Sequence, residues 1–345
     1  MRQRHTRPSR ERRARHVRGG LSRLAVLLLL GGVTANCERG GDPPAEQRPR
    51  ARFAPYVEVT SSRPNLLEVL DATGQRDFTL AFVRADGHRC SVVWDGGLPL
   101  RDPGLLHEID ALTARGGSVT VATGGANGPY LEHHCATPED LAATYRQALD
   151  AVGTNRLDVD IEEDVPAERV NQALGLLRRE RGTTVTYTLP ATRDGLEPRA
   201  LSLLADAAGR GLEVSVNAMV MNFGRDAAQG DAAQGDAMLA SARRVVDQLH
   251  RIWPDRAPEW VHQRLGLTPM IGRNDDGTVT TADDARRLRA FADQHGVGHL
   301  GFWSLARDNG RCPGRADAAS DCSGIEQSPY EFTRILAHAQ RDGGG

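Results

Sequence analysis

Short hydrophobic runs alternate with amphipathic stretches along the chain from residue 51 to residue 340. The runs are rich in Val, Leu, Thr and Phe, and they are six to nine residues long, which is typical of β-strands. The stretches between them repeat apolar residues every three or four positions, as helices do when one face packs on a core. The pattern predicts strands at residues 53–59, 78–83, 118–123, 157–162, 184–190, 213–221, 264–271 and 299–305. It predicts helices at residues 138–151, 167–180, 197–209, 237–252 and 281–294, of which the first and the last begin with the capping sequences TPED and TADD.

The order of these elements predicts the fold class. Each predicted strand is followed by a helix or by a loop long enough to cross over, so neighbouring strands should run parallel. A series of this kind over about 290 residues favours an α/β fold, a (β/α)₈ TIM barrel that forms a single domain at residues 51–340. An open doubly wound sheet is the alternative, but no GxGxxG sequence follows the first predicted strand.

The fourth predicted strand carries the most unusual pattern in the chain. Leu157, Val159 and Ile161 alternate with Asp158, Asp160 and Glu162. In a barrel the aliphatic face of each strand packs on the outer helices, so the acids are predicted to point inward and Glu162 to lie at the carboxyl end of the strand. Burying three acids costs several kcal/mol each unless they share protons and hydrogen bonds. Active sites of barrels lie at this end, so the three acids are the first candidates for chemistry.

The amino terminus predicts export. The first 36 residues contain nine Arg and one Glu and end in the run LAVLLLLGGVTAN, which is typical of a secretory signal peptide. The apolar run is too short for a membrane-spanning anchor. Cys37 resembles the lipidation site of a bacterial lipoprotein, so a lipid anchor at Cys37 and free secretion both stay open. Residues 37–50 have the composition of a linker.

Charge limits the choice of partners. The first 36 residues carry +8 of a whole-chain net charge of −2, so the remainder carries −10. Because the remainder is negatively charged, we expect it to bind nucleic acid and anionic membranes weakly. Membrane contact is expected only through Cys37. We expect a monomer that needs no cofactor. The tandem repeat DAAQGDAAQGD at residues 226–236 is interpreted as a tolerated surface-loop duplication without chemistry.

The remaining cysteines predict two disulfides, because their number is even and an exported chain meets an oxidising compartment. Cys312 and Cys322 are close in sequence and are expected to pair, which leaves Cys90 with Cys135. The sequence HHC at residues 133–135 suggests a metal site, but no second ligand pair has zinc-like spacing. We therefore expect no metal.

The chain resembles glycoside hydrolase family 18, the chitinase family. Its signature D-G-x-D-x-D-x-E is matched by Asp158, Asp160 and Glu162, whereas Asn155 and Arg156 replace the opening Asp-Gly. Four further stretches resemble the family's later motifs in the right order: VATGGANG, with Ala122 in place of a serine, VNAMVMNFG, LGLTPMIGRND, and GFWSLARDN followed by CSGIEQSPYEF. The resemblance covers residues 51–340.

The resemblance implies substrate-assisted, retaining hydrolysis of β-1,4-linked N-acetylglucosamine, as in chitin or chito-oligosaccharides. Glu162 would be the general acid, and Asp160 would orient the sugar's acetamido group. Asp158 would share a proton with Asp160, and this coupling would keep Glu162 protonated near neutral pH. Trp303 would stack on the sugar, with Met219, Met221, Asn222 and Tyr56 as further substrate-binding candidates. Asn222 stands where related chitinases tend to have Asp.

Three alternatives remain open from the sequence. A sugar-binding lectin could retain the barrel without turnover, although the intact Glu162 argues against this reading. An endo-β-N-acetylglucosaminidase acting on N-glycans would use related chemistry. A divalent-metal enzyme built on the same three acids would need more carboxylates at neighbouring strand ends.

Overall fold

The computed structural model describes residues 50–60, 63–224 and 233–337. The predicted signal peptide at residues 1–36, Cys37, and the linker except Arg50 lie outside the described residues. Most of the repeat at 226–236 and the last residues of the predicted domain also lie outside them. No helix in the described ranges combines the length and the apolar character that crossing a bilayer requires.

The central sheet consists of parallel strands in the order β1-β13-β10-β9-β7-β6-β5-β3-β2. The strand bounds are β1 Arg52–Phe53, β2 Tyr56–Glu58, β3 Asp77–Ala85, β5 Ser118–Gly124, β6 Arg156–Asp160, β7 Thr184–Thr192, β9 Ser215–Met219, β10 Leu265–Thr268 and β13 His299–Leu300. Every neighbouring pair in this order is parallel, as the strand and helix alternation predicted.

The first strand segment closes the sheet into a barrel. β1 pairs with β13 and β2 pairs with β3, and only residues 54–55 separate β1 from β2. The Ala54 amide donates to the Leu300 carbonyl at 2.9 Å, and the Thr79 amide donates to the Pro55 carbonyl at 3.0 Å. The two ends of the sheet order are therefore one continuous segment. The barrel prediction is confirmed, and the open doubly wound sheet is wrong.

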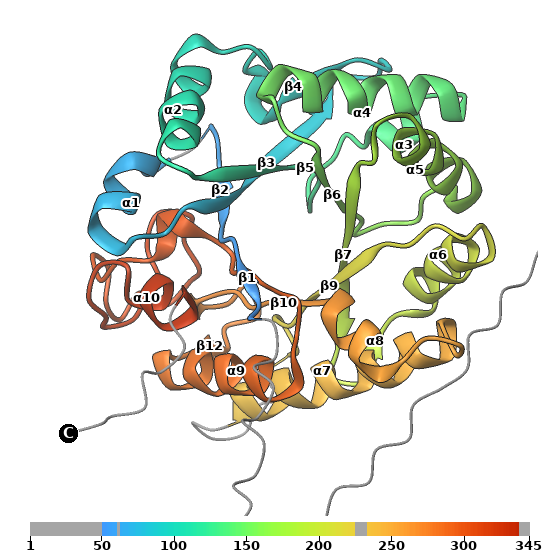
Figure 1. Cartoon of the computed structure of the whole chain (residues 1–345). Coiled ribbons are helices and arrows are strands. Elements are labelled where there is room, and N and C mark those ends of the chain that lie inside the picture. Colours follow the sequence, from blue (N-terminus) through green and yellow to red (C-terminus); the bar gives the residue numbers. More distant parts are fainter. Residues whose placement is uncertain (1–49, 61–62, 225–232, 338–345) are drawn as a thin grey trace, which may run out of the picture. The chain divides into compact units, whose positions relative to one another are not determined.

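Helices surround the strands (Figure 1). Their bounds are α1 Leu66–Thr73, α2 Pro103–Ala114, α3 Leu131–His134, α4 Pro138–Val152, α5 Ala167–Arg181, α6 Pro198–Gly209, α7 Ala233–Ile252, α8 Pro258–Arg264, α9 Ala282–His295 and α10 Glu331–Ala337. The five predicted helices are α4, α5, α6, α7 and α9, and both predicted caps are present: Thr137 accepts from the Asp140 amide, and Thr281 forms a capping box with Asp284. The prediction did not include α1, α2 and α8, which are short or only weakly amphipathic.

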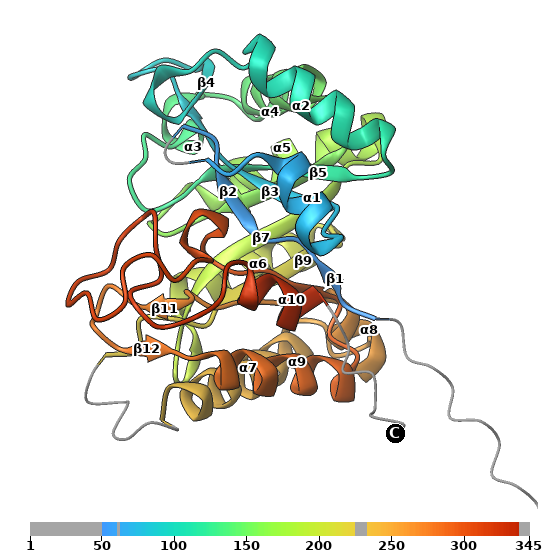
Figure 2. The ribbon, with the colours of Figure 1, turned by 90° about the vertical axis from the view of Figure 1, so that its left-hand side faces the viewer.

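Smaller elements lie at the carboxyl end of the barrel. They are β4 Val92–Trp94, the short helix η1 Asp95–Gly97, β8 Gly195–Leu196, the hairpin of β11 Gly272–Arg273 and β12 Val279–Thr280, and the short helix η3 Leu305–Arg307. Figure 2 shows β4, α3, β11 and β12 at one end of the barrel and the first described residues of the chain at the other. The entry of the chain and the carboxyl rim are therefore at opposite ends.

The core has two parts. Leu157, Val159 and Ile161 belong to the large cluster between the strands and the outer helices. Tyr56, Phe82 and neighbouring small residues form a separate cluster, with Trp303 packed against it. The aliphatic side chains of β6 thus face outward, as predicted, and its acids face the inside of the barrel.

Several strand predictions are too long at the carboxyl rim, among them those for β6 and β13. β6 ends at Asp160 rather than at residue 162, because the Glu162 amide donates to the Tyr130 hydroxyl instead of to a neighbouring strand. β13 ends at Leu300 rather than at residue 305, although Trp303 still forms an isolated bridge to Met270. Both segments leave the regular sheet where their side chains reach the rim.

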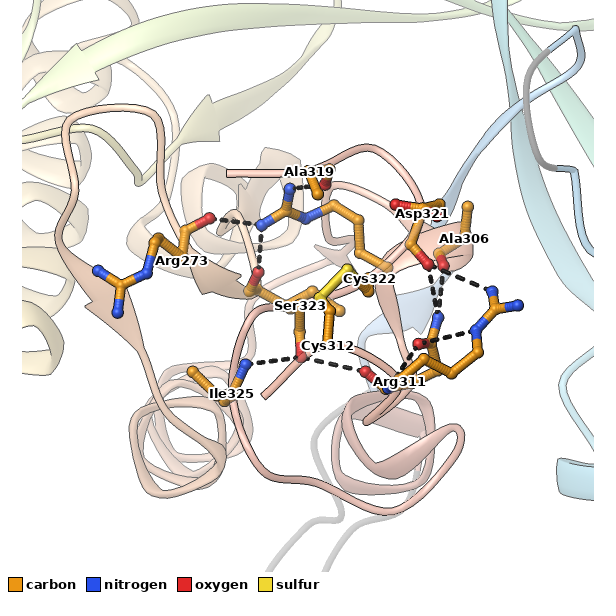
Figure 3. Close-up of a disulfide and its surroundings, with 12 residues drawn as sticks. Arg273, Ala306, Arg311, Cys312, Ala319, Asp321, Cys322, Ser323 and Ile325 are labelled. Carbon is orange, nitrogen blue, oxygen red and sulfur yellow. Dashed lines mark hydrogen bonds between the residues drawn. A yellow bond between two sulfur atoms is a disulfide. The ribbon is translucent and has the colours of Figure 1, made fainter. Parts of the chain in front are cut away.

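Both predicted disulfides are present. Cys90 and Cys135 have Cα atoms 4.7 Å apart, and Cys312 and Cys322 have Cα atoms 6.0 Å apart. The first links the β3–β4 loop to the end of α3, and the second closes the loop after η3 (Figure 3). Both therefore brace loops at the carboxyl rim.

Reduction of the two disulfides is expected to lower thermal stability and leave the barrel folded. The bridged cysteines are 45 and 10 residues apart, and closing each loop contributes on the order of 2–4 kcal/mol. Thermal melts with and without reductant should show a lower Tm with an unchanged far-UV spectrum below the transition. Peptide mapping without reductant checks the pairing: four free thiols, or a peptide joining Cys90 to Cys312, would contradict it.

Candidate active site

The three acids of β6 lie on the inner face of the barrel at increasing height. Asp158 is 2% exposed and Asp160 is 4% exposed, whereas Glu162, just beyond the strand, is partly exposed. The side-chain alternation of a strand places all three on one face. They therefore lead from the closed interior of the barrel to its open carboxyl end.

Asp158 is held by hydroxyl groups from neighbouring strands. The Tyr56 hydroxyl donates to one carboxylate oxygen at 2.7 Å, and the Thr188 hydroxyl donates to the other at 2.6 Å. The amide of Asn217 donates to both hydroxyls at 3.1 Å, and its carbonyl accepts from Thr268 at 3.0 Å. Each of the two hydroxyl groups thus donates to one oxygen of Asp158. Both oxygens of Asp158 must therefore accept hydrogen bonds.

The two buried acids differ in how readily they ionise. Burial raises the pKa of Asp158 to about 6, and the Thr188 and Tyr56 hydrogen bonds lower it. Burial raises the pKa of Asp160 well above its usual range, and the negative charges of Glu162 and Asp158 raise it further. One oxygen of Asp160 is buried without a hydrogen-bond partner. Asp160 therefore keeps its proton to a higher pH than an exposed Asp does.

The predicted proton sharing between Asp158 and Asp160 is not seen as a direct hydrogen bond and stays a prediction. Both oxygens of Asp158 accept from hydroxyl groups, and the hydrogen bonds of the described residues include none between the two acids. The acids interact through charge, because Asp158 raises the pKa of Asp160.

Glu162 lies among charged side chains from several strand ends. Burial raises the pKa of Glu162, Arg199 lowers it, Asp275 raises it and Arg84 lowers it. Burial is the largest of these causes, so the carboxyl group keeps its proton to a higher pH than an exposed Glu. The prediction attributed this effect to coupling with the acids below. Asp160 and Glu162 do interact through charge, and Arg199, Asp275 and Arg84 act on Glu162 as well.

Tyr130 fixes the backbone at Glu162. Its hydroxyl accepts from the Glu162 amide at 2.9 Å and donates to the Gly125 carbonyl at 2.9 Å. Gly125 and Gly124 have φ values of 81° and 89°, in the region that favours glycine. A Cβ atom at Gly124 would lie 2.0 Å from the Asp160 carbonyl oxygen, and one at Gly125 would lie 2.7 Å from the Phe82 ring. The glycine pair therefore allows β5 to approach the acidic strand closely.

An aromatic surface lies beside the acids. The rings of Trp303 and Phe82 are stacked, with centroids 5.7 Å apart and an interplanar angle of 19°. Tyr56 lies 6.1 Å from Trp303 and is buried through its bond to Asp158. Trp303 is partly exposed, so it can offer ring surface to a bound molecule as predicted. Tyr56 instead acts as the hydrogen-bond donor to the lowest acid.

Met219, Met221 and Asn222 lie at the end of β9, as predicted. Met219 is half-buried, Met221 is buried and Asn222 is exposed. Asn222 has a φ of 54°, a conformation that Asn tolerates well. Its amide nitrogen donates to Asp275 at 3.2 Å, and its carbonyl oxygen accepts from the Asp275 amide at 3.0 Å. Asn222 therefore fixes the position of a carboxylate from the β11–β12 hairpin.

The prediction missed several residues of this site. Phe82 lies near the end of the strand predicted at 78–83, Arg84 follows that strand directly, and Asp275 lies in the quoted sequence LGLTPMIGRND. Their position at strand ends was the available signal, because strand ends meet at the rim of a barrel. Two other aromatic residues lie away from the rim surface: Trp94 is fully buried, and the Tyr187 hydroxyl donates outward to Asn171 on α5.

Metal binding has no support among the described residues. They contain no group of three or more His, Cys, Asp or Glu side chains arranged to hold an ion. A surface hollow of about 790 Å³ lies mainly along α5 and the segment after α6, and none of the three acids lines it. The chemistry therefore points to the rim beside Trp303: a partly exposed acid with a raised pKa, next to buried acids and an aromatic surface.

Solved structures similar to this chain include chitinase domains. Active domain 2 of a chitinase from Pyrococcus furiosus is 32% identical and has a TM-score of 0.78, over 84% of this chain and 95% of that chain. Catalytic-site mutants of this domain have also been solved with chito-oligosaccharides bound. A fungal endo-beta-N-acetylglucosaminidase of glycosyl hydrolase family 18 shares the fold, at 16% identity and a TM-score of 0.55, over 84% of this chain and 97% of that chain.

Curated relatives are longer than this chain. A probable bifunctional chitinase/lysozyme of Escherichia coli is 31% identical over 326 residues, which are 88% of this chain and 36% of that protein. Endochitinase 11 of Metarhizium anisopliae is 30% identical over 295 residues, which are 80% of this chain and 56% of that protein. The chain thus spans between about a third and just over half of their lengths. A comparison with models of known protein families finds no match.

Replacing Asp160 by Asn is expected to stabilise the protein increasingly as pH rises. The pKa of Asp160 is higher in the folded state than in the unfolded chain, where it is about 3.9. Its favourable contribution to folding is therefore complete below about pH 4 and is lost as pH rises through the folded-state pKa. Asn cannot ionise, so its Tm advantage over the wild type should grow by about 2–4 °C from pH 5 to pH 8.

Asp158→Asn is the matched control for this measurement. Asp158 accepts two hydrogen bonds from hydroxyl groups, and an Asn amide would face one of these donors with another donor. We expect Asp158→Asn to lower Tm across the range. A Tm difference between Asp160→Asn and the wild type that does not change with pH would show that Asp160 is not the protonated group.

Proposed function

The chain belongs to glycoside hydrolase family 18, and on that basis we propose that it hydrolyses β-1,4 bonds between N-acetylglucosamine units in chitin or chito-oligosaccharides. The observation that carries the proposal is the series of three acids on the inner face of β6, of which only Glu162 reaches the open end beside Trp303. The chito-oligosaccharide complexes of the Pyrococcus furiosus domain support the choice of substrate.

In the proposed reaction Glu162 donates its proton to the oxygen of the bond that breaks. The carbonyl oxygen of the sugar's own acetamido group forms a bond to the anomeric carbon as the leaving group departs, which gives an oxazolinium ion. Water then attacks the anomeric carbon and gives a proton to Glu162, and the configuration is retained. The protein needs no nucleophile of its own, which fits a site where the two lower acids are buried.

Asp160 is assigned to the acetamido group. It lies between Glu162 and Asp158 on the inner face of β6, and one of its oxygens is buried without a partner. An acetamido N–H close to that oxygen would supply the missing donor. Asp160 would thereby orient the acetamido group, and its carboxyl oxygen would face the positive charge of the oxazolinium ion.

Trp303 is assigned to the sugar ring. Carbohydrate rings have apolar C–H faces that pack on an aromatic surface, and Trp303 is partly exposed while Phe82 supports it from below. Met219 and Met221, at the end of β9, are assigned to the acetamido methyl group. Few other aromatic residues reach this rim, so soluble or loosely ordered chains are the proposed substrates rather than crystalline chitin.

We propose that the protein works outside the cytoplasm. Both disulfides lie at the carboxyl rim, and structural disulfides are typical of oxidising compartments. The predicted signal peptide agrees with this assignment. The proposal extends to a lipid anchor at Cys37 as one of two forms, the other being free secretion.

Glu162→Gln is expected to reduce turnover of chito-oligosaccharides by about 10²–10⁴-fold, because the leaving oxygen then lacks a proton donor. Reducing-end release from defined oligomers is the measurement. Glu163→Gln is the matched control: it makes the same chemical change one residue later, on an exposed side chain that contacts His133. We expect Glu163→Gln to stay within about threefold of the wild type.

Equal turnover by the wild type and Glu162→Gln would refute the proposed acid. Oligosaccharide binding by calorimetry without any product over days would favour the lectin reading instead. Release of intact N-glycans, with no cleavage of chito-oligosaccharides, would favour the endo-β-N-acetylglucosaminidase reading.

Asp275→Asn and Arg199→Gln are expected to shift the pH dependence of kcat in opposite directions. The negative charge of Asp275 raises the pKa of Glu162, and the positive charge of Arg199 lowers it. Without Asp275 the acid loses its proton at a lower pH, so the alkaline limb should move down, by up to roughly one unit. Without Arg199 the alkaline limb should move to higher pH. This shift should be smaller at high salt, because salt screens the charge of the exposed Arg199. Shifts of the same sign would contradict this assignment.

A further inference from the structure

Arg307 is a buried cation whose guanidinium donates to backbone carbonyls. It lies in η3, directly after the end of β13, and is 1% exposed. Its guanidinium donates to the carbonyl oxygens of Ile271 at 2.9 Å, of Arg273 and of Ala319. Burial lowers the pKa of Arg307 to about 10, and the nearby charges of Asp275 and Glu58 raise it. Burying a charged side chain costs free energy unless hydrogen bonds and opposite charges compensate for the lost water. The carbonyl oxygens that Arg307 binds supply this compensation.

The three carbonyls belong to two segments that no strand pairing joins. Ile271 and Arg273 flank the start of the β11–β12 hairpin, and Ala319 lies in the loop closed by the Cys312–Cys322 disulfide (Figure 3). The guanidinium offers five donors in a fixed planar arrangement, so one side chain can hold both segments. A second contact joins the same segments, because the Arg273 amide donates to the Ser323 carbonyl at 2.7 Å.

The loop is itself tightly fixed. Asn309 donates to the Ala306 carbonyl at 2.7 Å and to the Asp321 carbonyl at 2.9 Å, and the Ser323 hydroxyl donates to the Asn309 carbonyl at 3.2 Å. Figure 3 shows these bonds around the disulfide. The loop therefore provides a rigid support on which Arg307 can hold the hairpin.

The hairpin carries the carboxylate that acts on Glu162. Asn274 donates to the carbonyls of Met270 at 3.1 Å and Gly272 at 3.0 Å, which fixes the turn next to the carbonyls that Arg307 holds. The following residue, Asp275, exchanges two hydrogen bonds with Asn222 at the end of β9. A continuous set of contacts thus runs from the disulfide loop through Arg307 and Asn274 to Asp275.

We infer that Arg307 is a positioning residue: together with the Cys312–Cys322 loop, it holds the β11–β12 hairpin so that Asp275 faces the proposed general acid Glu162. This inference rests on the proposed function only for its effect on catalysis. The placement of the hairpin is a structural claim that can be tested without any turnover.

Loss of Arg307 should change the pKa of Glu162 by changing the distance between Asp275 and Glu162. If the hairpin moves away, Asp275 contributes less negative potential at Glu162, and the acid ionises at a lower pH. Arg307→Gln should therefore move the alkaline limb of the kcat profile down by roughly 0.5 unit, in the same direction as Asp275→Asn. Combining Arg307→Gln with Asp275→Asn should add little, since the charge that the arginine positions is already absent.

The structural readout is hydrogen exchange in the full-length protein. In Arg307→Gln, backbone amides in residues 271–280 should exchange at least about tenfold faster than in the wild type. Arg307→Lys should give an intermediate rate, because an ammonium keeps the charge but cannot span the same carbonyls. Cys312→Ser with Cys322→Ser should also raise exchange in this segment, and this variant carries the test if Arg307→Gln does not fold.

Arg289→Gln is the matched control. Arg289 is also a buried arginine, and it donates to the Leu336 carbonyl at 2.8 Å and to Asp293 within α9, away from the hairpin. We expect this variant to lower Tm and to leave both the alkaline limb and the exchange of residues 271–280 as in the wild type. An equal effect of Arg289→Gln on either quantity would show that the role of Arg307 is general stability, which overturns the inference.

Two further outcomes decide the inference. Unchanged exchange of residues 271–280 in Arg307→Gln and in the cysteine variant would overturn it, whatever the activity. Faster exchange with an unchanged alkaline limb would overturn the link to Glu162. If Glu162→Gln has wild-type turnover, the proposed function fails, and the exchange data still decide whether Arg307 positions the hairpin.

Discussion

The burial of two carboxyl groups inside the barrel is the constraint on which the site depends. Asp158 and Asp160 are shielded from water, so each must be either hydrogen-bonded as an anion or protonated. At Asp158 the anion is hydrogen-bonded, by the hydroxyl groups of Tyr56 on β2 and Thr188 on β7. At Asp160 protonation is favoured instead, because burial raises its pKa and one of its oxygens has no hydrogen-bond partner among the described residues. Burial thus lets Asp160, directly below Glu162, keep its proton to a higher pH than an exposed Asp does.

The rim around Glu162 comes from segments that are distant in sequence. Tyr130 fixes its backbone from the loop after β5, Arg199 approaches from the start of α6, and Asp275 approaches from the hairpin after β10. Both disulfides lie in this rim, where the sheet no longer supplies backbone partners. Covalent closure and buried arginine contacts replace strand pairing there, so the charges that act on the acid can hold fixed positions.

The two departures from the family pattern have different consequences. Ala122 is fully buried in the inner cluster with Tyr56 and Phe82, so it contributes packing where a serine would need a hydrogen-bond partner. Asn222 donates to the Asp275 carboxylate. An Asp at this position would place two carboxylates against each other, and one of them would need a proton. Asn222 therefore holds the Asp275 side chain by a hydrogen bond where an Asp would repel it.

The sequence by itself determined the barrel, the inward face of β6 and the cysteine pairs. These follow from local periodicity and from counting, and the alternation of Leu157, Val159 and Ile161 with three acids already fixes which side faces the helices. Only the tertiary structure decided which acid holds the proton and which charges reach Glu162. A pKa depends on burial and on distances in space, so the influence of Phe82, Asp275 and Arg307 could not be read from positions 80, 113 and 145 residues away from Glu162.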